Sequence, residues 1–173
     1  MKKYFYILFI LLITLQTTGC QSTIHSNETL ELAKSTENSV EVTISMKRDA
    51  SDQLYLMATF TPTEPSLHLY SKDLPKNGFD GLGRPALLEI PNSSSIQATG
   101  ELTESASSQP LAYGPQGLLV YPEGPITLSL PISFPAEKSG TLETISITYM
   151  ACNQQGCRAP VQDKAITIKL PKL

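Results

Sequence analysis

The sequence has little of what nucleic-acid-binding proteins, metal sites and membrane-spanning proteins usually require. Its 173 residues contain no tryptophan, two histidines and three cysteines, and the formal net charge is −3. The Lys and Arg residues form no basic cluster, which argues against nucleic-acid binding. No cluster of His or Met suggests a metal site. The longest apolar run holds about twelve residues, whereas a spanning helix needs about 20. We expect no metal and no other cofactor.

That apolar run lies between a basic start and a cysteine. Two lysines precede an apolar stretch over residues 4–15, and small residues ending at Gly19 precede Cys20. The order of charge, apolar core and small residues is typical of a secretory signal peptide. Lipoprotein signals share this ending, although Thr17 stands where they usually have Leu, Val or Ile. We predict removal of residues 1–19 and a diacylglycerol on Cys20. The alternative is an ordinary signal peptide that leaves Cys20 as a free thiol.

The lipid prediction places the chain in the cell envelope, anchored to a membrane and facing the periplasm. Gln21 follows the lipidated position and favours the outer over the inner membrane. Residues 20–38 are rich in Ser, Thr, Asn and Glu with little periodicity, so they are predicted to form a flexible tether. The remaining residues 39–173 match one domain with a single core.

Alternation of apolar and polar residues is the strongest structural signal in this domain. Pro131 interrupts one alternating segment and cannot donate a ladder hydrogen bond, so we expect that strand at a sheet edge or a bulge. No amphipathic helix of ordinary length is evident. The pattern predicts an all-β, immunoglobulin-like antiparallel β-sandwich. Its strands are expected at residues 40–46, 54–60, 126–134, 145–149 and 166–170, with shorter candidates at 67–70, 86–90 and 118–121.

The three cysteines are an odd number, which is resolved if Cys20 carries the lipid and Cys152 pairs with Cys157. An exported, oxidising compartment permits that bond. Residues 153–156 would then form a tight connection between neighbouring strands. If the alternation of the 145–151 segment continues, Cys152 lies on the outer face and is accessible.

The short spacing of this pair leaves its role open. Closing a loop of about six residues stabilises a fold by about 2 kcal/mol, against about 4.7 for a 100-residue loop. Stability alone is therefore a modest reason for the bond, and a short exposed disulfide is also the more reducible kind. The alternatives are a static structural disulfide and a metal site with His68, for which two thiolates and one histidine are too few ligands.

Three stretches resemble one family in the same order. They are the segment Ile147–Pro160 around the cysteine pair, the segment Leu67–Lys72, and Tyr113-Gly114 ahead of Tyr121. Together they are similar to the amino-terminal periplasmic domain of the thiol:disulfide interchange protein DsbD, the disulfide bond corrector family. The resemblance covers roughly residues 40–170. It implies an immunoglobulin-like sandwich whose two cysteines take part in disulfide exchange. The family's acidic pair and Phe are replaced here by Pro110-Leu111-Ala112, so its carboxylates and aromatic lid are missing.

The resemblance implies a redox carrier domain rather than a complete enzyme. In this reading Cys157 attacks a partner disulfide and Cys152 resolves the mixed disulfide, with Arg158 favouring the thiolate. Tyr70 and Tyr113 would flank the pair. The expected partners are thioredoxin-like or DsbD-type redox proteins of the envelope, and the reductant must come from another polypeptide. The main alternative is a non-catalytic immunoglobulin-like binding or scaffold lipoprotein that keeps the disulfide as a static clip. Metal delivery or cytochrome maturation is a third.

Overall fold

The structure, a computed structural model, describes residues 23–112, 115 and 117–173, and within them it is built from strands. A single 3-10 turn, Ala136–Lys138, is the only helical element of these residues. The strands are β1 Thr29–Glu37, β2 Val40–Arg48, β3 Leu54–Pro62, β4 His68–Leu69, β5 Leu87–Glu89, β6 Gln97–Ala98, β7 Thr103–Glu104, β8 Gln109–Pro110, β9 Leu119–Val120, β10 Ile126–Ser133, β11 Leu142–Tyr149, β12 Ala151–Asn153, β13 Gly156–Cys157 and β14 Val161–Lys169.

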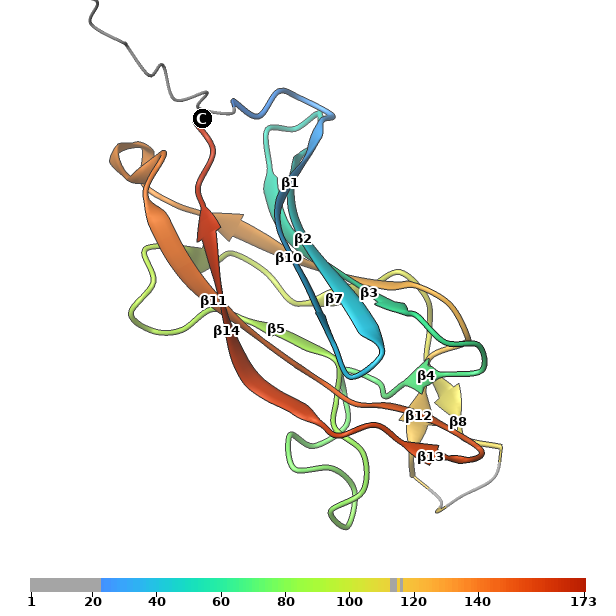
Figure 1. Ribbon diagram of the computed structural model, residues 1–173. Helices are drawn as coiled ribbons and strands as arrows, with labels where there is room; N and C mark the ends of the chain where they lie inside the picture. The colour runs from blue at the N-terminus through green and yellow to red at the C-terminus, as the bar shows by residue number, and fades with distance from the viewer. Residues whose placement is uncertain (1–22, 113–114, 116) are drawn as a thin grey trace, which may run out of the picture.

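Two antiparallel sheets face each other (Figure 1). The larger has the order β1-β2-β3-β10, with the short strands β6 and β7 both paired to the outer side of β10. The smaller has the order β14-β11-β5. The predicted all-β, immunoglobulin-like antiparallel β-sandwich is confirmed, and all eight predicted strands are present within one or a few residues of their expected bounds.

Strict alternation along the long strands builds the core between the sheets. In β2 and β3 every second side chain is buried, and Phe60 of β3 meets Tyr149 of β11 edge to face, with ring centroids 5.6 Å apart. The Tyr149 hydroxyl keeps a polar partner by donating to the Glu37 carbonyl oxygen at 3.0 Å. Burial of this apolar surface stabilises the sandwich by about 25 cal/mol for each Å² removed from water. We call this set of buried side chains the main core.

Pro131 lies inside the larger sheet rather than at its edge. The strand β10 has β3 on one side and β6 and β7 on the other, so the expected edge position is wrong. The carbonyl of Pro131 accepts from the Thr99 amide at 2.9 Å, in the stretch where the chain leaves β6 and has not yet begun β7. The missing N–H of proline therefore faces a break in the neighbouring ladder, where little is lost.

The domain begins earlier than residue 39. The predicted tether of residues 20–38 is wrong over Thr29–Glu37, which forms the full-length edge strand β1 against β2. Ile24 is buried, and Thr23 forms an isolated bridge with Lys172 near the carboxyl terminus. β1 was missed because a two-sided, mostly polar edge strand is held by its backbone ladder and has no apolar stripe. The predicted signal peptide and Cys20 lie outside the described residues.

A smaller assembly closes the end of the sandwich far from β1's start and from the carboxyl terminus (Figure 1). It contains the three-stranded sheet β13-β12-β4 and the β8-β9 pair. Leu69 and Ala151 of these strands still belong to the main core. A second group of buried side chains is separate from it, and we call this group the cysteine-end cluster: Tyr70, Leu74, Leu118, Val120 and Cys152. In the part of the chain that the structure describes, no helix is long and apolar enough to cross a membrane.

Candidate functional site

The candidate site is a disulfide across the tight β12–β13 hairpin. Cys152 and Cys157 are directly opposite each other in the ladder, with Cα atoms 4.0 Å apart, and their sulfurs are bonded. The Asn153 side-chain oxygen accepts from the backbone N–H groups of Gln155 at 3.0 Å and Gly156 at 3.1 Å, which fixes the turn. The predicted pairing and the predicted tight connection are both confirmed.

The two cysteines differ in exposure. Cys152 is only 2% exposed, whereas Cys157 lies at the surface. The expectation that Cys152 is accessible is wrong, although it lies on the predicted face of the strand. Tyr149 and Ala151 point into the main core, and the opposite face at Cys152 is covered by the cysteine-end cluster. The exposed member of the pair is therefore the second cysteine.

Tyr70 holds the buried sulfur from the adjacent strand end. It follows β4 directly, and its hydroxyl donates to the Cys152 Sγ at 3.2 Å. Bridges from Tyr70 to Pro85 and Val120 fix its backbone. Burial raises the pKa of the Tyr70 phenol, so it stays protonated and remains a donor at neutral pH. The structure thus brings Tyr70, predicted as a flanking residue, to the cysteine pair.

His68 lies on the same strand, directly opposite Cys152 in the β4–β12 ladder. Its ring packs edge to face against Tyr70, with ring centroids 5.8 Å apart. Burial lowers the pKa of His68, and the negative charge of Glu123 opposes this shift. The residue is half-buried rather than a solvated surface histidine. Among the described residues, no group of three or more His, Cys, Asp or Glu is arranged to hold a metal ion.

Arg158 does not place a free cation beside the sulfurs. Its guanidinium forms an ion pair with Glu64, and its Nε donates to the Ser39 hydroxyl at 3.3 Å. Successive side chains of a strand point to opposite faces, so adjacency in sequence to Cys157 does not bring the charge to the thiol. The electrostatic role predicted for Arg158 therefore lacks structural support. Tyr113, the other predicted flank, lies outside the described residues.

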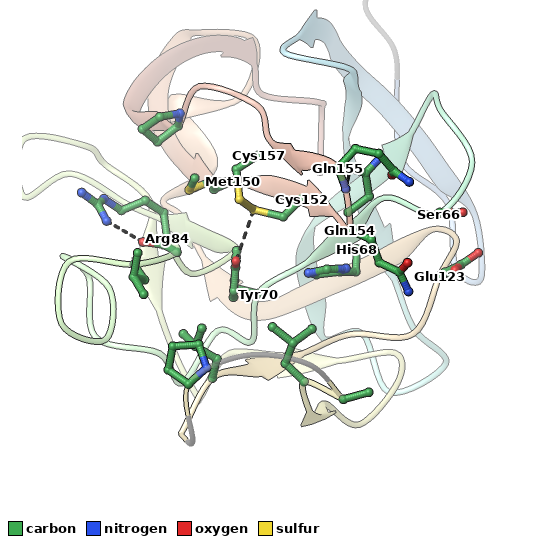
Figure 2. Close-up of a pocket in the computed structure, with 18 of the residues that line it drawn as sticks. Ser66, His68, Tyr70, Arg84, Glu123, Met150, Cys152, Gln154, Gln155 and Cys157 are labelled. Atoms are coloured by element: carbon green, nitrogen blue, oxygen red, sulfur yellow. Dashed lines mark hydrogen bonds between the residues drawn. A yellow bond between two sulfur atoms is a disulfide. The ribbon is translucent and has the colours of Figure 1, made fainter.

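An open pocket of about 1090 Å³ surrounds the disulfide (Figure 2). Side chains from separate segments of the chain line this pocket, and both cysteines are among the lining residues. Its apolar lining includes Leu82, Leu111, Leu118 and Met150, and its rim carries the neutral amides of Asn153, Gln154 and Gln155. Sequence reasoning did not find the contributions of Leu82 and Glu123, because both come from turns without periodic signal. The pocket offers a mixed polar and apolar surface, with Arg84 and Glu123 as charged side chains, beside the exposed Cys157.

Comparison with known proteins gives one structural similarity. No family model matches the sequence, and no curated protein matches it. Among solved structures, the amino-terminal domain of DsbD from Neisseria meningitidis, in the reduced form, is similar at a TM-score of 0.42 and 13% identity. The match covers 67% of this chain and 75% of that one.

Proposed function

We propose that this chain is a thiol–disulfide exchange module of the cell envelope, using Cys152 and Cys157. The observation that carries the proposal is the unequal pair: Cys157 is an exposed residue at an open pocket, whereas Cys152 is buried and its sulfur accepts from a phenol hydroxyl. A static clip needs no open pocket on one sulfur and no hydrogen-bond donor on the other.

The chemistry follows from this asymmetry. A partner thiolate attacks the exposed Cys157 Sγ, the bond between the two sulfurs breaks, and Cys152 leaves as a thiolate that accepts the Tyr70 hydrogen bond. The partner's second thiolate then attacks the mixed disulfide and releases Cys157 as a thiolate, which takes up a proton. The partner becomes oxidised and this chain becomes a dithiol. The reverse sequence, beginning with the Cys157 thiolate, reduces a second partner.

The partners and the location belong to the same proposal. Thioredoxin-like or DsbD-type proteins fit, because they present a pair of thiols that can complete both steps. A lipid on Cys20 would hold the module at a membrane facing the periplasm, where disulfides persist. Replacing Cys20 by serine is expected to move the chain from the detergent phase to the aqueous phase in a partition assay. Unchanged partition would contradict the lipid anchor.

The reduction potential of the pair tests the exchange activity. The full-length chain carrying Cys20→Ser, in detergent, has only these two thiols and can be titrated with glutathione while mass spectrometry counts the free thiols. A midpoint between about −120 and −270 mV, the range of known exchange proteins, is expected. A midpoint below about −300 mV identifies a structural disulfide and supports the rival role, a lipid-anchored binding module. The burial of Cys152 is the observation that favours that rival.

Two single-cysteine variants provide a matched pair for the order of attack. In Cys152→Ser the remaining thiol is exposed, whereas in Cys157→Ser it is buried. Oxidised glutathione is expected to form a mixed disulfide faster with the Cys152→Ser variant. Equal rates, with both variants folded, would show that the burial difference does not select Cys157 as the attacking sulfur.

A further inference from the structure

His68 carries an unexplained polar atom beside the disulfide. Its Nε2 is buried and has no hydrogen-bond partner among the residues that the structure describes. Two arginine Nε atoms share this property, but each belongs to a guanidinium whose Nη1 is hydrogen-bonded, Arg48 to Asp52 and Arg84 to backbone carbonyls. Buried polar atoms in native proteins nearly always have partners, so an orphan at a reactive site calls for a chemical explanation.

The position of this atom points to the buried thiol. His68 faces Cys152 across the β4–β12 ladder, and the side chains of both residues line the same pocket (Figure 2). Directly opposite side chains in an antiparallel pair have Cβ atoms about 4.5 to 5.5 Å apart. Tyr70, two residues beyond His68 on the same face, already touches the Cys152 sulfur. His68 therefore lies directly across the ladder from the residue whose sulfur must react second.

The resolving step needs a proton acceptor at this point. A thiol surrounded by apolar side chains ionises poorly, and only its thiolate attacks a disulfide. The Tyr70 hydroxyl donates to this sulfur, and burial raises the pKa of that phenol, so it is not the base. Besides the cysteines and His68, the titratable or charged side chains that line the pocket within the described part of the chain are Tyr70, Arg84 and Glu123. Arg84 is a permanent cation that donates to the carbonyls of Asn77 and Gly81 at 3.0 Å each.

We propose that His68 is the proton acceptor for Cys152 in the resolving step. This inference rests on the proposed exchange activity. Once the Cys157 sulfur is bonded to a partner sulfur, Nε2 of neutral His68 takes the proton of the Cys152 thiol. The Cys152 thiolate attacks the Cys157 Sγ, the intramolecular disulfide forms, and the bond to the partner breaks. The partner leaves as a thiolate and receives the proton from the imidazolium, so His68 returns to its neutral state.

Burial and charge suit His68 to this task. Because burial lowers its pKa, the imidazole is neutral and able to accept a proton at neutral pH. Glu123 favours the protonated form by its negative charge, which stabilises the imidazolium that the transfer creates. Burial therefore keeps the imidazole unprotonated before the transfer, and the charge of Glu123 stabilises the imidazolium during the transfer.

An aromatic disulfide reagent separates the two steps. The reduced full-length chain with Cys20→Ser reacts with 5,5′-dithiobis(2-nitrobenzoate) in a first phase that consumes reagent at Cys157. The second phase is independent of reagent concentration and releases one more thionitrobenzoate as Cys152 closes the disulfide. His68→Gln is expected to slow the second phase about tenfold at pH 7, the factor that one unit of thiol pKa represents. The first phase is expected to be unchanged.

The pH profile distinguishes a proton acceptor from a packing residue. In the parent chain the second phase is expected to slow only below neutral pH, where His68 becomes protonated. In His68→Gln it should rise with pH until the thiol itself ionises. Free imidazole is expected to restore the second phase of His68→Ala. His25→Gln, at the exposed histidine near the amino terminus, is the matched control and should behave as the parent. Equal second phases and equal pH profiles in parent and His68→Gln would overturn the proposal.

A measurement without substitution at the site covers the case in which the variants do not fold. The chain has only two histidines, so their ring signals can be assigned with His25→Gln and followed by NMR. The pKa of His68 is expected to be lower in the reduced than in the oxidised chain, because the Cys152 thiol donates a hydrogen bond to neutral Nε2 and so favours the neutral imidazole. An identical pKa in both states would overturn the proposal. These tests use no partner protein and no equilibrium potential, so they can fail while the reduction potential supports exchange, and the reverse.

Discussion

The two ends of this molecule are built on different principles. The sandwich is built mainly on strands of eight or nine residues, and alternating side chains of β2, β3 and β10 help to fill one continuous core. The cysteine end consists of strands of two or three residues around a small separate cluster. Long strands are held to their neighbours by many equivalent contacts. The short strands of the cysteine end depend on individual bonds such as the disulfide and the Tyr70 hydrogen bond. Stability is therefore concentrated in one region and chemistry in the other.

Truncation of the largest buried side chains should show this division most strongly. Phe60→Ala removes a fully buried ring from the main core and is expected to lower the free energy of unfolding by about 3 to 5 kcal/mol. Leu118→Ala, in the cysteine-end cluster, is expected to cost about 2 kcal/mol, at the low end for a buried leucine, because the open pocket lets the site relax. Urea unfolding measures both. A larger loss for Leu118→Ala would show that the cysteine end contributes as much as the sandwich.

Removal of the disulfide should have a smaller effect on the fold. Replacing both Cys152 and Cys157 by alanine is expected to lower the free energy of unfolding by about 2 kcal/mol, because the closed loop is short. The far-ultraviolet circular dichroism of the sandwich should not change. The dithiothreitol-reduced parent chain is the control, since it loses the bond and keeps both side chains. Unfolding of the β-sheet signal on reduction would mean that the sandwich depends on its cysteine end.

Loss of the phenol hydroxyl should change redox behaviour with little effect on the fold. Tyr70→Phe removes the donor to the Cys152 sulfur and destabilises the thiolate by about 1 kcal/mol. The reduction potential at mildly alkaline pH is expected to become more negative by about 20 mV.

Tyr149→Phe is the matched control for that change. It also loses one buried hydroxyl bond, to the Glu37 carbonyl, but lies in the main core away from the pocket. It should lower stability and leave the potential unchanged. Equal potentials for Tyr70→Phe and the parent would contradict the role of the phenol.

The pH dependence of stability should give the smallest difference. Burial lowers the pKa of His68, so the unfolded chain binds a proton at this residue more readily than the folded chain below about pH 6.5. The contribution of neutral His68 is complete above that pH and is lost as the pH falls toward its folded pKa. The parent chain is expected to lose more stability than His68→Gln between pH 7 and 5. Carboxylates with lowered pKa, such as Glu143, are present in both chains and cancel in the comparison.

How far the sequence predicts the structure also differs between the two regions. The stripes of β2, β3 and β10 predict the sandwich because burial on one face imposes a period of two. The site could be predicted only in part. The cysteine pairing follows from counting, and Tyr70 from a family resemblance, but the burial of Cys152 depends on a cluster of side chains from distant segments that has no periodic signature. The ion pair of Arg158 with Glu64 and the orphan nitrogen of His68 arise from contacts between segments far apart in the sequence.

The bridge between Thr23 and Lys172 has a geometric consequence for access to the site. Both ends of the folded chain meet at one pole of the sandwich, and the cysteine hairpin lies toward the other (Figure 1). If Cys20 carries the predicted lipid, only two residues separate it from Thr23, where the bridge to Lys172 begins. This connection spans about 10 Å at full extension. The disulfide would then stand at a nearly fixed height above the bilayer. A redox partner would have to reach the disulfide at that distance from the membrane. The distance would therefore help to select which envelope proteins exchange with this chain.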